Sequence, residues 1–136
     1  MSLIPNDYWK GFSVLIVDDD VPTRIFIGEL LKTSGAILYE ALTAEKGENI
    51  LKEHPEINVV LLDLVMPDKG GFEAIKSYHK IDPKLTVIAH TALVTSEVIN
   101  LCKQAGFTDF LPKPLDIPRF YGTLGNFLKP IPGLDH

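Results

Sequence analysis

The sequence has little cysteine, no long apolar run and no cluster of basic residues. Its single cysteine, Cys102, excludes an internal disulfide. With an N-terminus that does not resemble a signal peptide, it predicts a cytoplasmic protein. No apolar run approaches the roughly 20 residues that a membrane-spanning helix needs. The formal net charge is −5 without any concentration of Lys or Arg, which argues against direct binding to nucleic acid.

The length and composition suit one globular domain. The chain has 136 residues, of which 46% are hydrophobic and 23% charged, which is not the composition of a disordered chain. A chain of this size can bury roughly two thirds of its unfolded surface and needs no covalent cross-links. We expect a lead-in over residues 1–11, a domain over 12–128, and a tail over 129–136 that contains two prolines and a glycine.

Apolar runs alternate with helix-like segments along the domain. Strands are predicted over 12–17, over 36–42, from 59 to Asp63, over 85–90 and over 108–111, and each is followed by a helix. The helices are expected from Pro22 to Gly35, from Ala44 to about His54, from Phe72 to about Lys80, from Thr95 or Ser96 to Gly106, and from about Ile117 to Leu128. Such alternation predicts the α/β class: a doubly wound, five-stranded parallel sheet with helices on both faces in three layers.

The apolar residues of the helices indicate which faces pack on the sheet. In the first helix they recur at helical spacing as Ile25, Phe26, Leu30 and Leu31. In the fourth helix we expect the sheet-facing residues to be Val98, Ile99, Leu101 and Cys102. The last helix gathers on one face Ile117, Phe120, Tyr121, Leu124, Phe127 and Leu128. The opposite face of this helix carries little charge and consists of Arg119, Gly122, Thr123, Gly125 and Asn126. It is either a plain solvent-facing surface or a docking face for a second copy or an attached domain.

Four of the predicted strands are followed by polar residues that hydrophobic patterning does not explain. These are Asp18 and Asp19 after the first strand, Asp63 after the third, Thr91 after the fourth and Lys113 after the fifth. Because the carboxyl ends of parallel strands meet at one edge of a sheet, we expect these side chains to converge in one crevice.

The chemistry of these residues points to phosphate and a metal ion. Asp18, Asp19 and Asp63 offer oxygen ligands that suit Mg²⁺ beside a phosphate. The Asp18-Asp19 pair alone would more commonly cap a helix, and its convergence with Asp63 is what favours a metal site. Lys113 can pair with an unphosphorylated Asp63 or bind a phosphate oxygen, although a lone lysine can also simply reach to solvent. A carboxylate is a competent nucleophile toward phosphorus, so Asp63 is the candidate phosphate acceptor.

Three further residues lie close to this predicted crevice. The Thr91 hydroxyl could follow a phosphate oxygen and pull its loop inward, and Phe110 lies near enough to fill the space that Thr91 vacates. Considered without the other site residues, Thr91 would be an ordinary hydroxyl at the end of a strand and Phe110 an ordinary core residue. His90 precedes Thr91, and strand alternation should turn it away from the site.

Several segments together resemble the receiver domain of two-component response regulators, over about residues 12–128. They are Val14-Leu15-Ile16-Val17-Asp18-Asp19-Asp20, Leu62-Asp63-Leu64-Val65-Met66-Pro67, Gly71-Phe72-Glu73, Thr91-Ala92 and Phe110-Leu111-Pro112-Lys113-Pro114. The resemblance implies a flavodoxin-like sheet of order 2-1-3-4-5. It also implies a signalling switch rather than an enzyme, which accepts phosphate on Asp63 from a histidine kinase or a histidine phosphotransfer protein.

The resemblance further implies a role for each residue of the site. Mg²⁺ (or Mn²⁺) would be held by Asp18, Asp19, Asp63 and the backbone carbonyl of Val65. Lys113 would bind the phosphate, Thr91 would be the switch hydroxyl and Phe110 the aromatic residue coupled to it. The output surface would be the fourth helix, fifth strand and fifth helix, which would also serve a homodimer or an attached output domain.

Some positions depart from the commonest pattern of the family, and two alternative functions remain open. Gly70 stands where an Asp is frequent, and Phe110 replaces a frequent Tyr. Val65 and Leu93, each two residues beyond a site residue, are apolar, so we expect slow self-dephosphorylation. The alternatives are a phosphohydrolase of the haloacid dehalogenase type, whose Asp-x-Asp-x-Thr motif is incomplete here, and a degenerate receiver that acts only as a protein-interaction module.

Overall fold

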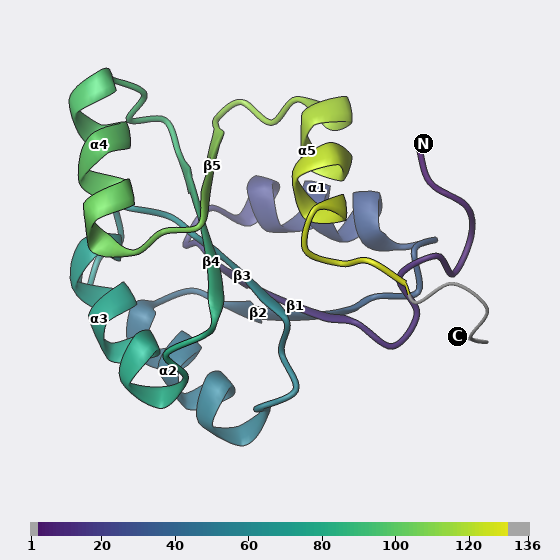
Figure 1. The fold of residues 1–136 in the computed structure, drawn as a ribbon, viewed down its shortest axis with the longest axis horizontal. Coiled ribbons are helices and arrows are strands. Elements are labelled where there is room, and N and C mark those ends of the chain that lie inside the picture. The colour runs from purple at the N-terminus through teal and green to yellow at the C-terminus, as the bar shows by residue number, and fades with distance from the viewer. Residues whose placement is uncertain (1–2, 131–136) are drawn as a thin grey trace.

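The computed structural model describes residues 3–130, and within them strands and helices alternate as predicted (Figure 1). The strands are β1 (Ser13–Val17), β2 (Ile37–Ala41), β3 (Val59–Leu62), β4 (Thr86–Thr91) and β5 (Asp109–Pro112). The helices are α1 (Val21–Leu31), α2 (Ala44–Glu53), α3 (Gly71–Ile81), α4 (Ser96–Ala105) and α5 (Ile117–Gly125). No described helix has the length and apolar character needed to cross a membrane.

The sheet is parallel and has the order β2-β1-β3-β4-β5, which confirms the predicted fold class. In the register of the sheet, Val17 at the end of β1 lies between Ala41 of β2 and Leu62 of β3. The residues that follow these strands are therefore level with one another. The Asp63 N–H extends the ladder by donating to the Val17 carbonyl at 3.0 Å. This register places the acids after β1 and β3 side by side.

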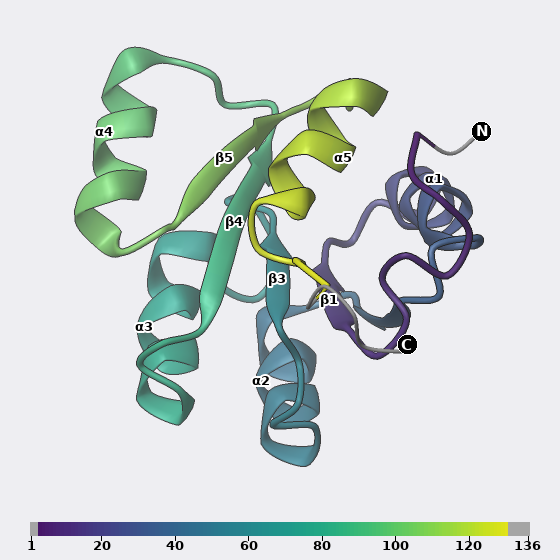
Figure 2. The same ribbon diagram turned by 45° about the vertical axis from the view of Figure 1, so that its right-hand side comes forward.

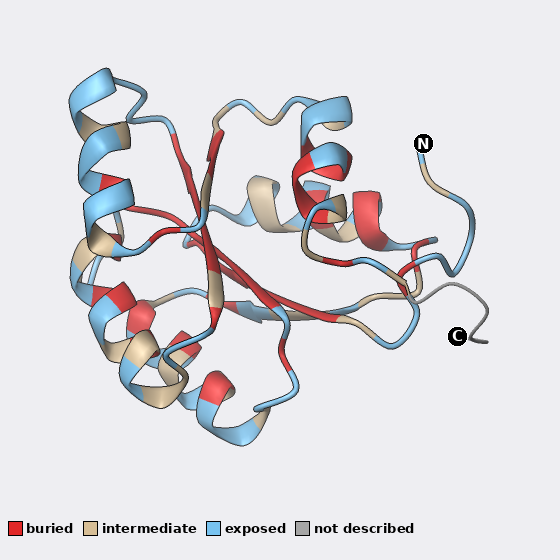
Figure 3. Cartoon of the chain, in the orientation of Figure 1, coloured by how far each residue is buried: buried red, intermediate tan, exposed pale blue. Residues whose placement is uncertain are grey.

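Helices cover both faces of the sheet, so the core has two halves (Figures 2 and 3). Successive strand residues point to opposite faces, and β1 shows this clearly. Leu15 and Val17 pack with residues of α2, α3 and α4, whereas Val14 and Ile16 pack with residues of α1 and α5. The strands are consequently buried on both faces, which explains their nearly continuous apolar sequence.

Side-chain caps fix where the helices begin. The Thr43 and Thr95 hydroxyls accept the N–H groups of the first turns of α2 and α4, and Asp20 and Asp116 do the same for α1 and α5. At the other end of α4, Gly106 takes the left-handed conformation, with φ of 99°. These caps match the helix boundaries predicted from the sequence at Thr43 and Gly106.

Two predicted helix ends are wrong. Helix α1 ends at Leu31 rather than running on to Gly35, because the Ser34 hydroxyl donates to the Leu31 carbonyl at 2.7 Å and turns the chain. Helix α5 ends at Gly125, a residue with low helix propensity, rather than at Leu128.

Some residues do not face the way their spacing indicated. The face of α1 that packs on the sheet consists of Ile27, Leu30 and Leu31, which are buried. Ile25 and Phe26 lie outside this face and are 62% and 40% exposed. In α4 the buried residue is Cys102, and its neighbour Leu101 is 44% exposed rather than packed on the sheet. In α5, Thr123 was assigned to the outer face but is buried together with Phe120, Tyr121 and Leu124.

The segment before β1 contributes to the core. Trp9 is fully buried, and its ring lies 5.9 Å from that of Tyr121 in α5. The backbone N–H of Trp9 donates to the Ser34 carbonyl at 2.8 Å, and the Tyr121 hydroxyl donates to the Leu30 carbonyl at the end of α1. The lead-in thus helps to hold α1 against α5. Most of the predicted tail, residues 131–136, lies outside the described residues.

Candidate functional site

Three carboxylates meet at the carboxyl edge of the sheet, where the sequence predicted them. Asp18 and Asp63 directly follow β1 and β3 and are buried, while Asp19 is exposed. One oxygen from each of the three lies within 4.8 Å of the others. Such a cluster of oxygen donors has the chemistry that Mg²⁺ and Mn²⁺ favour. The residues present therefore fit a divalent cation.

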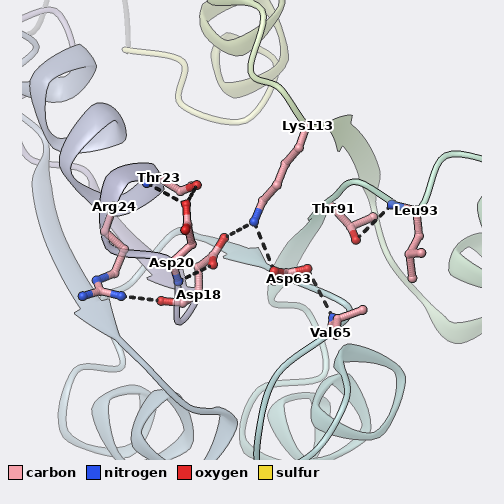
Figure 4. Close-up of polar contacts among 9 residues, drawn as sticks. All are labelled: Asp18, Asp20, Thr23, Arg24, Asp63, Val65, Thr91, Leu93 and Lys113. Atoms are coloured by element: carbon pink, nitrogen blue, oxygen red, sulfur yellow. Dashed lines mark hydrogen bonds and ion pairs between the residues drawn. The ribbon is translucent and has the colours of Figure 1, made fainter.

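Lys113 joins this cluster from the carboxyl end of β5 (Figure 4). Its ammonium lies 2.7 Å from Asp18 Oδ2 and 3.1 Å from Asp63 Oδ2. The Lys113 N–H donates to the Thr91 carbonyl at 2.9 Å, which anchors the residue just beyond β5, and the Lys113–Pro114 bond is cis. The single positive charge of Lys113 balances only part of the negative charge of the three carboxylates. The cluster therefore keeps a net negative charge that attracts a cation.

Burial and pairing shift the pKa values of these groups. Burial raises the pKa of the Asp18 carboxyl, and the hydrogen bond and charge of Lys113 offset only part of this effect. Burial acts to lower the pKa of Lys113, but its contacts with Asp18 and Asp63 outweigh burial and raise that pKa above its ordinary value. Lys113 therefore remains a cation at neutral pH.

The loop after Asp63 approaches its neighbours closely. The Val65 N–H donates to Asp63 Oδ1 at 3.2 Å, which leaves Oδ2 to Lys113. Gly71 opens α3 directly against this loop, and a Cβ at that position would lie 2.8 Å from the Asp63 carbonyl oxygen and 2.9 Å from Leu64 Cα. Both are backbone atoms that cannot move aside easily. A glycine is therefore needed where α3 touches the loop that contains Asp63 and Leu64.

Thr91 and Phe110 lie on the same side of the sheet. Thr91 ends β4, and its buried hydroxyl accepts the Leu93 N–H at 3.3 Å. Phe110 of β5 pairs in register with Ala89, two residues before Thr91, and packs in the core half formed with α2, α3 and α4. The predicted switch hydroxyl and its aromatic neighbour are thus carried by two adjacent, paired strands, β4 and β5.

His90 lies on the opposite side of β4 from Thr91, as strand alternation predicts. It is not turned away from the site as predicted, because it lines a pocket together with Lys113 and its pKa is affected by the charges of Lys113 and Asp63. Its neighbour Ile88 packs in the core half formed by α1 and α5, and His90 continues that side of the strand. His90 is itself buried.

Two residues that hold the site were not found from the sequence. Arg24 of α1 donates to the Asp18 carbonyl at 2.7 Å and pairs with Glu40 at 3.5 Å, so it ties α1 to the acid loop. Asp68, in the loop after β3, accepts the first two N–H groups of α2, from Ala44 at 3.1 Å and Glu45 at 3.0 Å. Loss of some hydration acts to raise the pKa of the exposed Asp68 carboxyl, but the hydrogen bonds from backbone N–H groups, including those of Ala44 and Glu45, together outweigh it and lower that pKa. The pair of Arg24 with Glu40 and the contacts of Asp68 with α2 join segments 16 or more positions apart, and no local spacing in the sequence signals them.

Comparison with known proteins identifies the family. A family model of the response regulator receiver domain matches residues 14–124. The chemotaxis protein CheY of Thermotoga maritima is 31% identical over 88% of this chain and 99% of its own length. A chain of the crystal structure of the CheX–CheY–BeF3–Mg²⁺ complex from Borrelia burgdorferi superimposes with a TM-score of 0.80 and 30% identity, covering 85% of this chain and 87% of that one. The chain therefore belongs to the response regulator receiver domains of two-component signalling.

Members of this family are phosphoacceptor signalling domains rather than classical enzymes. The domain also occurs within longer relatives. A cyclic di-GMP phosphodiesterase of Thermotoga maritima is 33% identical over 77% of this chain, which spans only 28% of that protein.

Proposed function

We propose that this protein is a phosphorylation-dependent switch, in which Asp63 accepts a phosphoryl group from a phosphohistidine of a histidine kinase or a histidine phosphotransfer protein in the cytoplasm. The observation that carries this proposal is the position of the Lys113 ammonium, which contacts both Asp18 and Asp63 within a cluster of three carboxylates. A nucleophile, a fixed cation and a cation-binding set of oxygens are thus assembled in one place.

The transfer follows from this geometry. An Asp63 carboxylate oxygen attacks the phosphorus, an O–P bond forms, and the P–N bond breaks as the donor imidazole leaves and takes up a proton. Lys113 moves its charge from the carboxylate to a phosphoryl oxygen, and catalysis rests on this positioning and neutralisation. Asp18, Asp19, Asp63 and the Val65 carbonyl would hold Mg²⁺ or Mn²⁺, which supplies further neutralisation of the phosphoryl charge.

The switch would run through Thr91 and Phe110. A phosphoryl group on Asp63 offers oxygens that the Thr91 hydroxyl can approach, and this movement would release its hydrogen bond with the Leu93 N–H. Phe110 lies on the same side of the sheet and would take up the vacated space. The surface formed by α4, β5 and α5 would change as a result and serve a partner, a second copy or an attached output domain.

The phosphorylated state should be long-lived. Val65 and Leu93 are 60% and 46% exposed on the loops beside Asp63 and Thr91, and neither can hold or activate an attacking water. We expect Val65→Asn with Leu93→Glu to hasten decay of the phosphorylated form about tenfold, which corresponds to about 1.4 kcal/mol of barrier. Ile37→Asn, a polar change at a similarly exposed residue of β2, is the matched control and should leave the decay unchanged. An unchanged decay in the double variant would refute the account of the lifetime.

The proposed function is tested by incubating the protein with acetyl phosphate and Mg²⁺ and measuring its intact mass. We expect the gain of one phosphoryl group, which requires Mg²⁺ and is abolished by Asp63→Asn. Asp82→Asn changes an acid at the C-terminal end of α3, away from the site, and should still be phosphorylated. Absence of any gain would contradict the proposal and favour a module that acts only through protein interactions.

A further inference from the structure

Arg24 of α1 holds the acid loop, residues 18–20, at both of its ends. Its guanidinium Nη1 donates to the Asp18 carbonyl at 2.7 Å (Figure 4), and its backbone N–H donates to the Asp20 carbonyl at 3.2 Å. The guanidinium Nε lies 3.5 Å from Glu40 of β2, and the Arg24 side chain is only 11% exposed. A planar guanidinium with two fixed partners has little freedom to move, so α1 and β2 together determine its position.

The position of the acid loop decides where two of the three clustered carboxylates lie. The Asp18 N–H donates to the Ala41 carbonyl at 3.0 Å, and Asp18 Oδ1 accepts the Asp20 N–H at 2.9 Å. With Arg24 on its carbonyl oxygen, Asp18 is held by both backbone groups and by one carboxylate oxygen. Asp19 is exposed and lies between the two carbonyl groups that Arg24 contacts. The contacts of Arg24 therefore bear on both Asp18 and Asp19.

Arg24 and Lys113 contact Asp18 in different ways. The guanidinium binds the carbonyl oxygen of Asp18, whereas the carboxylate of Asp18 is bound by the Lys113 ammonium and the Asp20 N–H. If Arg24 acted only through its positive charge, removing it would strengthen the binding of a cation to the acids. If Arg24 acts by holding the loop, removing it would weaken that binding, because the carboxylates would no longer be held in place. The two roles thus predict changes of opposite sign.

We infer that Arg24 is a positioning residue of the cation site, which acts through the Asp18 carbonyl to keep the carboxylates of Asp18 and Asp19 where they bind Mg²⁺. Its hydrogen bond is charge-assisted and therefore stronger than one between neutral groups, and the ion pair with Glu40 fixes its direction. The inference rests on the proposed Mg²⁺ site, but it does not depend on whether Asp63 accepts phosphate.

The test is a Mg²⁺ titration of the unphosphorylated full chain, followed by NMR at the backbone amides of Asp18, Asp19 and Asp63. Arg24→Met keeps an apolar stem of similar length and removes both the charge and the N–H donors. We expect this change to raise the Kd for Mg²⁺ about tenfold, as is typical when a group that orients a metal ligand is lost. Tighter binding in Arg24→Met would show that Arg24 acts through its charge, and either that result or an unchanged Kd would overturn the inference.

Two further variants separate positioning from a general loss of stability. Tyr121→Phe removes the hydrogen bond at the other end of α1, on the Leu30 carbonyl, and should lower the urea midpoint without changing the Kd for Mg²⁺. An equal rise of the Kd in Tyr121→Phe would overturn the inference.

Arg24→Lys serves if Arg24→Met does not fold. It keeps the charge but cannot hold the Asp18 carbonyl and Glu40 with one planar group, so its Kd should lie between those of the wild type and Arg24→Met. A wild-type Kd in Arg24→Lys would again favour an effect of charge alone and contradict the inference. Absence of Mg²⁺ binding by the wild type would overturn the proposed cation site together with this inference, whereas the outcomes above overturn the inference alone.

Discussion

The buried imidazole of His90 should make the stability of this protein depend on pH in a defined way. Its pKa is about 4 in the folded protein, against 6.5 for an ordinary histidine. Below about pH 6.5 the unfolded chain binds a proton at this residue and the folded protein does not. The free energy of unfolding must therefore fall as the pH is lowered from about 6.5 toward about 4, and above that window His90 has no pH-dependent effect.

The size of the effect follows from the two pKa values. Relative to about pH 7.5, protonation of His90 in the unfolded chain should remove about 1 kcal/mol at pH 5.5 and about 2–3 kcal/mol at pH 4.5. His90 is almost fully buried, so solvent screening does not reduce these values much. For a domain whose total stability is about 5–15 kcal/mol, the loss is readily measured.

The assay is urea unfolding of the wild type and His90→Leu across this pH range, followed by fluorescence. The single tryptophan, Trp9, is fully buried against Tyr121 and reports loss of the core directly. We expect the wild type to lose stability relative to His90→Leu by the amounts above. Parallel curves for the wild type and His90→Leu would refute the assignment of a neutral, buried imidazole.

Other perturbations test the packing and the charge balance. Gly71→Ala places a Cβ 2.8 Å from the Asp63 carbonyl oxygen and should cost about 1–3 kcal/mol in urea unfolding, whereas Gly122→Ala, with nothing within 4 Å, should be neutral or stabilising by up to about 1 kcal/mol. Tyr121→Phe removes a buried hydrogen bond to a carbonyl of α1 and should cost about 1–3 kcal/mol, visible as a lower midpoint. Lys113→Ala removes a competing cation, so Mg²⁺ should raise its melting temperature more than that of the wild type, yet its phosphorylation by acetyl phosphate should be slower; equal Mg²⁺ effects would contradict this charge balance.

The sheet and the convergence of the site residues could be predicted because both depend on local patterns. Apolar runs that alternate with capped helices dictate a parallel sheet, and the sheet aligns the residues after its strands. Asp18, Asp63 and Lys113 are brought together for this reason alone. Their roles in phosphoryl transfer stay predictions until the protein is phosphorylated.

What the sequence did not predict depends on long-range packing. The exposure of Ile25 and Phe26 is decided by the angle at which α1 meets the sheet, which spacing alone does not determine. The cap that Asp68 gives to α2 joins residues more than twenty positions apart. The pocket at His90 likewise forms only when α1 and the turn after β5 are folded against each other.

The central claim is that Asp63 is the phosphate acceptor, and mapping the modified residue tests it most directly. An aspartyl phosphate is an acyl phosphate, so borohydride reduction of the protein treated with acetyl phosphate and Mg²⁺ converts the modified aspartate to homoserine. We predict that peptide mass spectrometry will find homoserine at position 63. Homoserine at Asp18 or Asp19 instead, or at no aspartate, would contradict the account.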